Sequence, residues 1–421
     1  MSSYFHCLLL DMLVIRMVES IVAAACSRIG KNVLHLDSSD HYGGLWASYN
    51  FDGLQKDSPQ EEKKEEGEDK PEDAKADPLL FSRGPLVELL ISSNIARYAE
   101  FRCVTRVLTW LNDRLMPVPC SRADVFSTEA VGIVEKRQLM KMLTSIKDTY
   151  FKNVIFLSLD WNDKTFKEYL AHKGLTPNLI HYVLYAIAGG TNTMPCLEGV
   201  KECKKFLMSL GRYGNTPFLW PMYGSGELPQ CFCRLCAVFG GVYCLNRPID
   251  KVQTKTVDEG KTVVTIDSKS KTLNCDHLVI GINECPKDLI SPEPAESCDI
   301  SKAVFITNGS IMKNDKEPLT LLRFPPLTDE DHAVTVLEVG PATGSCPKGL
   351  CKYSTHIFTC DYETVESMTH LHLTTLPAAE LWLAILQLLA FPLQRNSKHL
   401  ESNLGHIRVN HQYFSLRSVK S

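Results

Sequence analysis

Glycine is missing from the turn that follows the first predicted strand, Met12–Ile15. The chain there runs Ile-Arg-Met-Val-Glu up to Glu19, enters an amphipathic helix, and reaches a second strand, Val33–Leu36, which ends at Asp37. This order of strand, helix, strand and acidic residue is typical of units that bind dinucleotides. Glycine lets the backbone of such units approach the pyrophosphate, so the side chains in this turn argue against a bound flavin or nicotinamide cofactor.

An excess of basic charge is also missing. The 421 residues include 45 Lys and Arg against 49 Asp and Glu, which gives a formal net charge of -4. A surface that binds nucleic acid has to neutralise phosphates, so this balance argues against a nucleic-acid partner. Asp11 interrupts the apolar run near the N-terminus, and no basic segment precedes that run, which favours a strand over a signal peptide.

The chain lacks an uninterrupted apolar run of the ~20 residues that a membrane-spanning helix needs. The strongest candidate is Leu376–Leu393, which Glu380 and Gln387 interrupt and Pro392 closes. A buried or interfacial helix, or an unpaired tail, is therefore favoured over a membrane span.

Cysteine is plentiful, but the 16 cysteines show no repeated short spacing. In the absence of a secretory signal this predicts free thiols in a reducing cytosol. Cys231, Cys233 and Cys236 raise the question of a metal site. On a helix Cys231 and Cys233 would point to nearly opposite sides, so we interpret the three as small buried thiols.

Catalytic patterns are missing too. Ser225 has a glycine on either side, but Tyr223 stands where a nucleophile elbow has its first glycine. The glycine-rich stretch Gly340–Ser345 is typical of a plain turn. The sequence therefore assigns no catalytic residue.

What is present indicates two domains, because 421 residues with 44% hydrophobic content exceed one simple core. Residues 55–78 are densely charged and almost without apolar side chains, so we expect a disordered acidic insert. Order resumes with a helix that begins at Pro85. A β-hairpin follows, with strands over Val104–Trp110 and Leu115–Val118 on either side of Leu-Asn-Asp-Arg.

Residues 124–210 show only helical patterns. One helix carries an apolar stripe that includes Leu139, a second is capped by Thr176 with Pro177 behind it, and a third stops at Gly211. We interpret this stretch as an all-helical domain inserted into an α/β domain. Its apolar stripes are read as ordinary core, with a ligand cavity as the alternative.

After Gly211 the pattern is mixed again, with a helix between two glycine turns and then several short strands. The strands are predicted to complete the first sheet. They cover Val242–Leu245, Val263–Ile266, Leu278–Ile280, Val304–Thr307 and Val334–Val339.

Several stretches resemble one known family, the Rab escort proteins, which are component A of Rab geranylgeranyltransferase. The matching stretches are VLHLDSSDHYGGLWAS, RYAEF, VPCSRADVF, VEKRQLMKMLT, LTPNL and LGRYGNTPFLWPMYGSGELPQCFCRLCAVFGGVYCL. The likeness runs from about Val18 to Cys360, and the last of these blocks is the most specific. The sister family of Rab GDP dissociation inhibitors shares the GELPQ block, whereas GRYGNTPF, SRADVF and the charged insert favour the escort proteins.

The resemblance implies an α/β fold like that of FAD- or NAD(P)-binding flavoproteins, without the flavin, and with an inserted helical domain. Domain I, which binds Rab, is expected over 1–123 and 211–360. Domain II is expected over 124–210, and residues 361–421 form a divergent tail. The family binds GDP-loaded Rab GTPases and presents them to the transferase α/β heterodimer for C-terminal prenylation. It then shields the geranylgeranyl lipid and delivers the Rab from the cytosol to a membrane.

The same resemblance implies site residues. Tyr42, Glu227, Arg234 and Cys244 match the Rab-binding platform, and Phe126 and Arg137 match the pair that docks the transferase. An aromatic ring and an arginine are good interface anchors. The alternative for Glu227 and Arg234 is an internal salt bridge. For Phe126 it is a buried loop anchor, and prenyl binding would use the apolar interior of the helical domain.

The sequence departs from the family in its first turn, in the segment after residue 55, and from about Asp361 onward. The resemblance then implies that the last elements of domain I and a C-terminal lipid-handling tail are missing or replaced. Three alternatives stay open at this stage: a GDP dissociation inhibitor that recycles prenylated Rabs, a flavin or NAD oxidoreductase, and a non-functional truncated product. As an escort protein the chain would be a non-catalytic accessory subunit with no cofactor and no metal.

Overall fold

The structure is a computed structural model, and the part of it described below comprises twelve stretches of the chain. These are residues 8–9, 17–48, 79–127, 132–147, 161, 163–257, 261–269, 271–281, 299–312, 318–326, 333–359 and 374–376. The predicted strand Met12–Ile15 and the acidic insert 55–78 lie outside the described residues. The same holds for the tail 361–421 and for the apolar run Leu376–Leu393, apart from the short stretch 374–376.

The described helices and strands follow one another as listed here. The helices are α1 (Met17–Arg28), η1 (Gly44–Trp46), α3 (Pro85–Ser92), η2 (Ile95–Arg97), α4 (Arg122–Ser127), α5 (Ile133–Lys147), α7 (Phe166–His172), α8 (Pro177–His181), η3 (Tyr182–Ile187), α9 (Cys196–Ser209), α10 (Glu227–Val238) and η6 (Pro341–Thr343). The strands are β1 (Leu8–Leu9), β2 (Val33–Leu36), β3 (Leu80–Phe81), β4 (Phe101–Cys103), β5 (Arg106–Leu111), β6 (Arg114–Pro117), β7 (Phe218–Pro221), β8 (Val242–Cys244), β9 (Lys251–Val257), β10 (Lys261–Ser268), β11 (Lys271–Cys275), β12 (Asp299–Thr307), β13 (Leu319–Phe324), β14 (Val334–Val339), β15 (Cys351–Thr359) and β16 (Thr374–Leu376).

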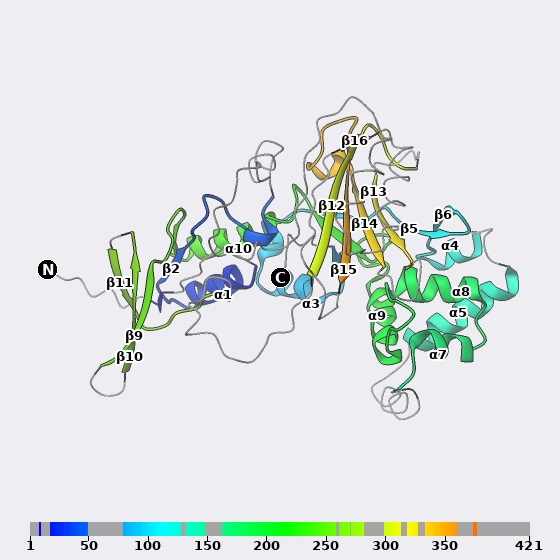
Figure 1. Ribbon diagram of the computed structural model, residues 1–421, viewed down its shortest axis with the longest axis horizontal. Coiled ribbons are helices and arrows are strands. Elements are labelled where there is room, and N and C mark those ends of the chain that lie inside the picture. The colour runs from blue at the N-terminus through cyan, green and yellow to red at the C-terminus, as the bar shows by residue number, and fades with distance from the viewer. Residues whose placement is uncertain are drawn as a thin grey trace, which may run out of the picture.

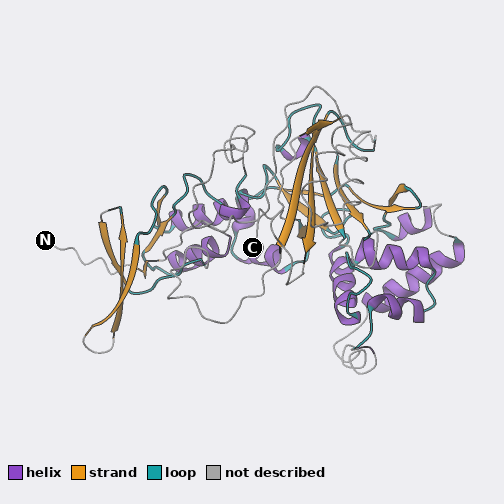
Figure 2. Cartoon of the chain, in the orientation of Figure 1, coloured by secondary structure: helices purple, strands orange, loops and turns teal. Residues whose placement is uncertain are grey.

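The molecule is elongated, and its helices and strands are arranged in successive groups along the long axis (Figures 1 and 2). The three-stranded sheet β11-β10-β9 lies at one end, and next to it a small parallel sheet, in the order β1-β2-β8, lies beside α1 and α10. A seven-stranded sheet, in the order β16-β12-β15-β14-β13-β5-β6, stands in the middle. Helices α4 to α9 gather at the other end, and we call the described helices between Arg122 and Ser209 the helical group.

The structure confirms the predicted helix as α1 and the predicted second strand, Val33–Leu36, as β2 of the small sheet. Strand β2 pairs in parallel with β8 through Leu34 with Val242, His35 with Tyr243 and Leu36 with Cys244. Helix α1 packs closely against α10 because its inward face carries the small residues Ala23 and Ala24, which are buried. Small side chains let two helix backbones approach each other, as ridge-into-groove packing requires.

The prediction that all later strands complete this first sheet is wrong, except for β8. Strands β9, β10 and β11 form a separate antiparallel sheet, and β12 and β14 belong to the seven-stranded one. Residues 278–280 form no strand, and Leu278 and Val279 pack instead against neighbouring apolar clusters. Pairing with the next strand along the chain closes a short loop, which explains the sheet of β9 to β11 and the pairing of β14 with β13 and β15. Strand β12 pairs with the more distant β15 and β16.

The predicted hairpin is confirmed as β5 and β6. Asn112 and Asp113 connect the strands with φ values of 54° and 57°. This left-handed pair is the backbone of the two-residue turn that suits the twist of a β-hairpin, and Asn and Asp tolerate it better than other side chains. Strand β5 also pairs in parallel with β13, and both strands contact the π-helical segment η3 of the helical group.

The helical group confirms the predicted helix ends. Helix α8 begins at Pro177 with Thr176 as N-cap, and α9 ends before Gly211, whose φ of 74° continues no helix. Helix α7 starts with a capping box, in which Thr165 and Glu168 satisfy each other's backbone N–H groups.

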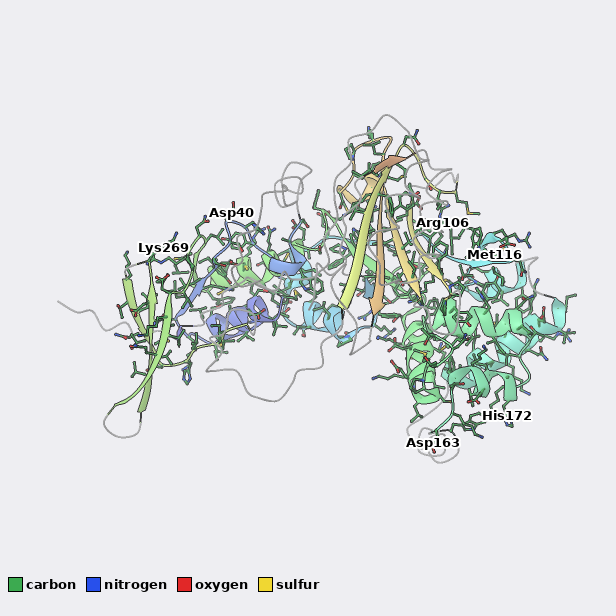
Figure 3. All side chains as sticks on the ribbon, in the orientation of Figure 1. Asp40, Arg106, Met116, Asp163, His172 and Lys269 are labelled. Carbon is green, nitrogen blue, oxygen red and sulfur yellow. The ribbon has the colours of Figure 1, made fainter. Side chains whose placement is uncertain are left out.

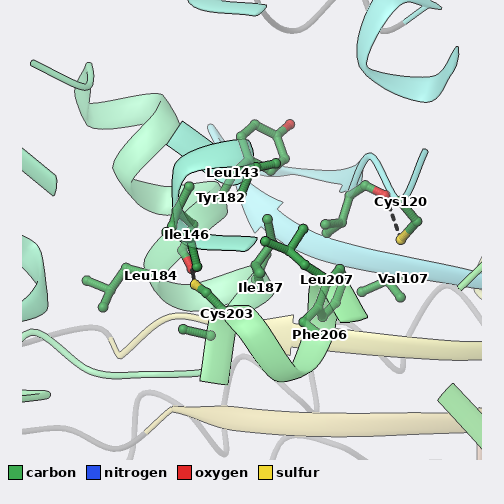
Figure 4. Close-up of a cluster of buried hydrophobic side chains, with 14 of the residues drawn as sticks. Val107, Cys120, Leu143, Ile146, Tyr182, Leu184, Ile187, Cys203, Phe206 and Leu207 are labelled. Carbon is green, nitrogen blue, oxygen red and sulfur yellow. Dashed lines mark hydrogen bonds between the residues drawn. The ribbon is translucent and has the colours of Figure 1, made fainter. Parts of the chain in front are cut away.

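The helical group has no core separate from the seven-stranded sheet. Buried side chains of the helices, such as Leu143 and Phe206, belong to one apolar cluster that also contains Val107 of β5 and Leu321 of β13. Figure 4 shows part of this cluster, including the Cys203 thiol that donates to the Val183 carbonyl at 3.7 Å. The prediction that the apolar stripes of these helices form core is confirmed for this cluster.

A buried arginine joins the sheet to a π-helix. Segment η3 is a π-helix, a rare form that is frequent at functional sites. The Nη1 of Arg323, on β13, donates to the carbonyls of Ala186 and Ile187, both at 2.9 Å. Burial lowers the pKa of this guanidinium to about 10, which still leaves it charged at neutral pH. The π-helix therefore has its last carbonyls held by the sheet.

Candidate functional site

The carboxyl edge of the small parallel sheet brings together the segments that carry the predicted Rab-binding residues. The Asp37 amide donates to the Cys244 carbonyl at 3.0 Å, which joins the ends of β2 and β8. The buried Asp37 carboxylate accepts a hydrogen bond from the Ser39 amide at 2.8 Å. Figure 3 labels Asp40 in the segment that leads from this edge to Tyr42. This edge is where open α/β sheets bind their ligands.

The residues at this edge do not fit a dinucleotide. A pyrophosphate would need the N-terminus of α1, but the first turn of that helix carries the buried carboxylate of Glu19. A carboxylate already takes the favourable interaction with the helix dipole there, and it would repel a phosphate. Asp37 is engaged by the Ser39 amide rather than turned toward a ribose. The frame of a cofactor site is present, with side chains of the wrong charge and size for the cofactor.

Tyr42 is half-buried over the end of the sheet. Its ring meets the ring of Tyr243 edge to face, with centroids 6.0 Å apart. Burial raises the pKa of the Tyr42 hydroxyl, and Cys233, Asp37 and Cys244 add to the shift. The phenol therefore stays protonated and can both donate and accept a hydrogen bond at the surface.

Helix α10 carries the other predicted residues. Glu227 is its first residue, and burial raises the pKa of the Glu227 carboxyl. Arg234 lies two turns further along the helix, is exposed, and stacks on the ring of Tyr98 at 5.1 Å. Glu227 and Arg234, which are both described, form no salt bridge with each other. The alternative of an internal ion pair is therefore wrong.

We call Tyr42, Glu227, Arg234 and Cys244 the platform. Tyr42 and Cys244 lie at the carboxyl ends of β2 and β8, and α10 begins at the same edge because it runs back against β8. The structure thus brings Tyr42, Glu227 and Cys244 to one edge, with Arg234 further along α10. Their role in binding stays a prediction.

The three cysteines of α10 are confirmed as buried thiols. Burial raises the pKa of Cys231 to about 11 and that of Cys233 to about 12. Both sides of α10 are covered, so cysteines that point in different directions are still buried. Within the described ranges, no three His, Cys, Asp or Glu side chains are grouped so that they can hold a metal ion.

The predicted transferase-docking pair lies on the surface of the helical group. Phe126, on α4, is 64% exposed, which rules out a buried loop anchor, and Arg137, on α5, is exposed. Lys136 holds the two helices together by donating to the Phe126 carbonyl at 2.9 Å. The sequence reading missed two neighbours, Ile133 and Val134, which are 72% and 69% exposed at the start of α5.

The signal for those two residues was present in the sequence. Ile133 and Val134 fall outside the apolar stripe of their own helix, which runs through Leu139, Met142 and Leu143. Apolar residues off the stripe face solvent. We call Phe126, Ile133, Val134 and Arg137 the helical patch, and a patch of exposed apolar side chains with an arginine suits a protein partner.

A cavity of about 320 Å³ opens between α4, α5 and α9. Its apolar lining includes Val125, Met140, Leu143, Phe206 and Leu207, and Ile187 of the π-helix also reaches it. Thr144 and Lys147 add polar groups to the lining. The helical stripes therefore form core, as predicted, and part of them also lines a cavity of the size that ligand sites have.

Comparison with known proteins places these features in a family. The family model described as GDP dissociation inhibitor matches residues 9–314, and the model described as RAE1/2 domain I, C-terminal region matches residues 300–374. The Rab proteins geranylgeranyltransferase component A of Drosophila melanogaster is 38% identical over 81% of this chain and 72% of its own length. Component A 2 of Mus musculus is 43% identical over 67% of this chain and 44% of its own length.

The chain belongs to the GDP dissociation inhibitor family, on its component A branch. A guanosine nucleotide diphosphate dissociation inhibitor of Arabidopsis thaliana is less similar, with 30% identity over 76% of this chain and 69% of its own length. The match to residue 374 extends past Asp361, where the sequence resemblance was expected to end, and residues 374–376 form β16 beside β12. The chain spans less than half the length of the mouse relative.

Solved structures confirm the predicted fold class of this component A family member. A Rab GDI from Plasmodium falciparum superposes with a TM-score of 0.66, at 18% identity over 92% of this chain and 87% of the other. An oxidoreductase from Methanosarcina mazei superposes with a TM-score of 0.56, at 11% identity over 98% and 87%. The α/β fold is thus shared with an oxidoreductase. Each helix among the described residues is too short or too polar to cross a bilayer.

We expect acidification to destabilise the small sheet because of the buried His35. His35 is buried beside Tyr243, neither ring nitrogen has a hydrogen-bond partner among the described residues, and burial lowers its pKa to about 4. The unfolded value is about 6.5, so between these two pH values only the unfolded chain takes up the proton. The free energy of unfolding therefore falls by roughly 2 kcal/mol from pH 6.5 to pH 5 on account of this group.

The measurement is the urea midpoint at pH 7, 6 and 5. The urea midpoint of a His35→Leu variant should change less with pH than that of the wild type, whatever the absolute stability of the variant. Equal slopes for the wild type and His35→Leu would contradict the assignment.

Proposed function

We propose that this chain is a Rab escort protein. The platform binds Rab GTPases in their GDP form, the helical patch binds the α/β heterodimer of Rab geranylgeranyltransferase, and the prenylated Rab is then carried through the cytosol to a membrane. Relatives named component A of that transferase, 38–43% identical to this chain, support the proposal. In this role the chain is an accessory subunit and leaves the chemistry to the transferase.

One observation carries the proposal. Glu227 and Arg234 lie exposed or half-exposed on one helix without forming an ion pair, beside the half-buried ring of Tyr42. Tyrosine and arginine are enriched at the energetic centres of protein interfaces, and a carboxylate can pair with a cationic group of the partner. Because Arg234 stacks on Tyr98, its guanidinium has a fixed direction before any partner arrives.

Reversing the charge of Arg234 should weaken the binding of a GDP-loaded Rab at least tenfold. The reason is that a carboxylate at this position removes the cationic contact and would repel any acidic group of the partner that pairs with the arginine. Affinity is measured by titration of fluorescent, GDP-loaded, unprenylated Rab with wild type and Arg234→Glu. Arg137→Glu, a matched reversal on the helical patch, should leave this affinity within twofold. Unchanged binding by Arg234→Glu would refute the platform.

The alternative function, recycling of prenylated Rabs by a GDP dissociation inhibitor, does not need the transferase. Phe126→Ala should therefore abolish or strongly reduce pull-down of the transferase and lower Rab prenylation in vitro, while GDP-Rab affinity stays unchanged. The thermal midpoint should not change, because the ring is already 64% exposed. Prenylation equal to that of wild type, or no stimulation of the transferase by the wild type, would favour the alternative.

The cavity of the helical group is the proposed place for the geranylgeranyl chain. Each buried methylene contributes ~0.8 kcal/mol, so even part of a chain of about 20 carbons gains substantial free energy there. The lining is apolar on α5 and α9, and polar groups such as Thr144 and Lys147 adjoin it. This arrangement suits a lipid that enters with one end attached to a peptide.

Filling the cavity should separate lipid binding from Rab binding. Met140→Trp replaces a flexible side chain of the cavity lining by a bulky ring, which leaves less room for a lipid. It should slow extraction of prenylated Rab from liposomes by about tenfold and leave binding of unprenylated GDP-Rab unchanged. Met208→Trp, on the exposed side of α9, is the control and should extract like wild type. Normal extraction by a folded Met140→Trp variant would place the lipid elsewhere.

A further inference from the structure

Tyr223 has a backbone conformation that its side chain does not favour. Its φ is 64°, in the left-handed region, which glycine adopts readily and which is unfavourable for a bulky side chain. The other residues besides glycine that have positive φ in the described part of the chain are three asparagines, an aspartate and a lysine. Tyr223 is the aromatic residue among them, and it lies just before α10.

Two contacts hold Tyr223 in this conformation. Its amide donates to the carbonyl of Thr343 at 2.7 Å. Its ring lies against Gly344, where an added Cβ would be 2.5 Å from the Tyr223 Cε1 atom, so that only glycine leaves room for the ring. Gly344 itself has a φ of 71°. The glycine-rich stretch that the sequence suggests to be a plain turn therefore also supports the tyrosine.

This strain gains little for the fold, because the Tyr223 side chain remains 58% exposed. Burial of the ring would offset the free-energy cost of the unfavourable backbone conformation by removing apolar surface from water, but this ring is largely in solvent. Strained residues that survive in exposed positions occur mainly at binding and catalytic sites. The outlier therefore points to a partner that covers the ring.

Tyr223 adjoins the platform. It precedes Glu227 by one short turn, and that turn packs on the segment that follows Tyr42. The Gly226 amide donates to the Ser48 hydroxyl at 3.0 Å, and a Cβ on Gly226 would come within 2.7 Å of the Ser48 amide nitrogen. Tyr223, Glu227 and Tyr42 are thus carried by two segments in direct contact.

We propose that Tyr223 is a further contact for the GTPase, presented by its strained backbone at the rim of the platform. The inference rests on the proposed function and adds a residue to its binding surface. The ring offers apolar area and the hydroxyl offers a donor, which is the combination that makes tyrosine frequent at interface centres. The complementary surface on the GTPase is an apolar patch next to a hydrogen-bond acceptor.

The test compares the binding of GDP-loaded, unprenylated Rab to wild type, Tyr223→Asn and Tyr223→Phe. Asparagine tolerates a left-handed backbone, so Tyr223→Asn removes the ring without adding strain. We expect Tyr223→Asn to lower the affinity about fivefold or more, with a thermal midpoint equal to or above that of wild type. Tyr223→Phe, which keeps the ring, should lose less affinity than Tyr223→Asn.

Tyr213, another exposed tyrosine, is the matched control, and Tyr213→Asn should bind like wild type. If Tyr223→Asn binds like wild type while Arg234→Glu loses binding, the inference on Tyr223 is overturned and the proposed function stands. If the wild type itself does not bind GDP-Rab, the proposed function fails. A lower thermal midpoint for Tyr223→Asn, with affinity lost in proportion, would make the residue structural and overturn the inference as well.

Discussion

One shared apolar core fixes the helical group on the seven-stranded sheet. The helices of the helical group bury their stripes against β5 and β13, so the group and the seven-stranded sheet fold as one packed unit. Arg323 adds a polar connection at the same boundary by donating to two carbonyls at the end of the π-helix. A buried guanidinium is stable only while those acceptors stay in place, which couples the position of the π-helix to the sheet. The cavity beside Ile187 depends on that coupling.

The small parallel sheet shows how a cofactor frame can serve another purpose. Its strand order and its two packed helices are those of a dinucleotide-binding unit, yet the first turn of α1 carries a buried carboxylate. Once the phosphate site is lost, nothing requires the carboxyl edge to remain a deep cleft. The same edge presents Tyr42 and the start of α10 to solvent instead. Function on this scaffold follows from the side chains at the edge, because the fold alone is shared with an oxidoreductase.

Local patterns made part of this structure predictable from sequence. Thr176 with Pro177, Gly211 and the Asn-Asp turn mark ends of helices and a hairpin, because each acts through the backbone of its immediate neighbours. Sheet membership was not predictable, since β10 and β14 have similar sequence patterns but pair with different strands far apart in the chain. The exposed Ile133 was missed although it lies off the apolar stripe of its own helix, which the sequence does show. The strain at Tyr223 has no sequence signal beyond the glycines around it.

Helix α10 of the platform and helices α4 and α5 of the helical patch lie far apart along the elongated molecule (Figure 1). Because the seven-stranded sheet and the helical group share one core, the distance from that sheet to the patch cannot shorten by hinge motion between them. In the proposed function, two large globular partners therefore bind at separate places on the elongated molecule. The reach between them has to come from the client itself, so a GTPase with too short an unstructured C-terminus would be a poor substrate however tightly it docks.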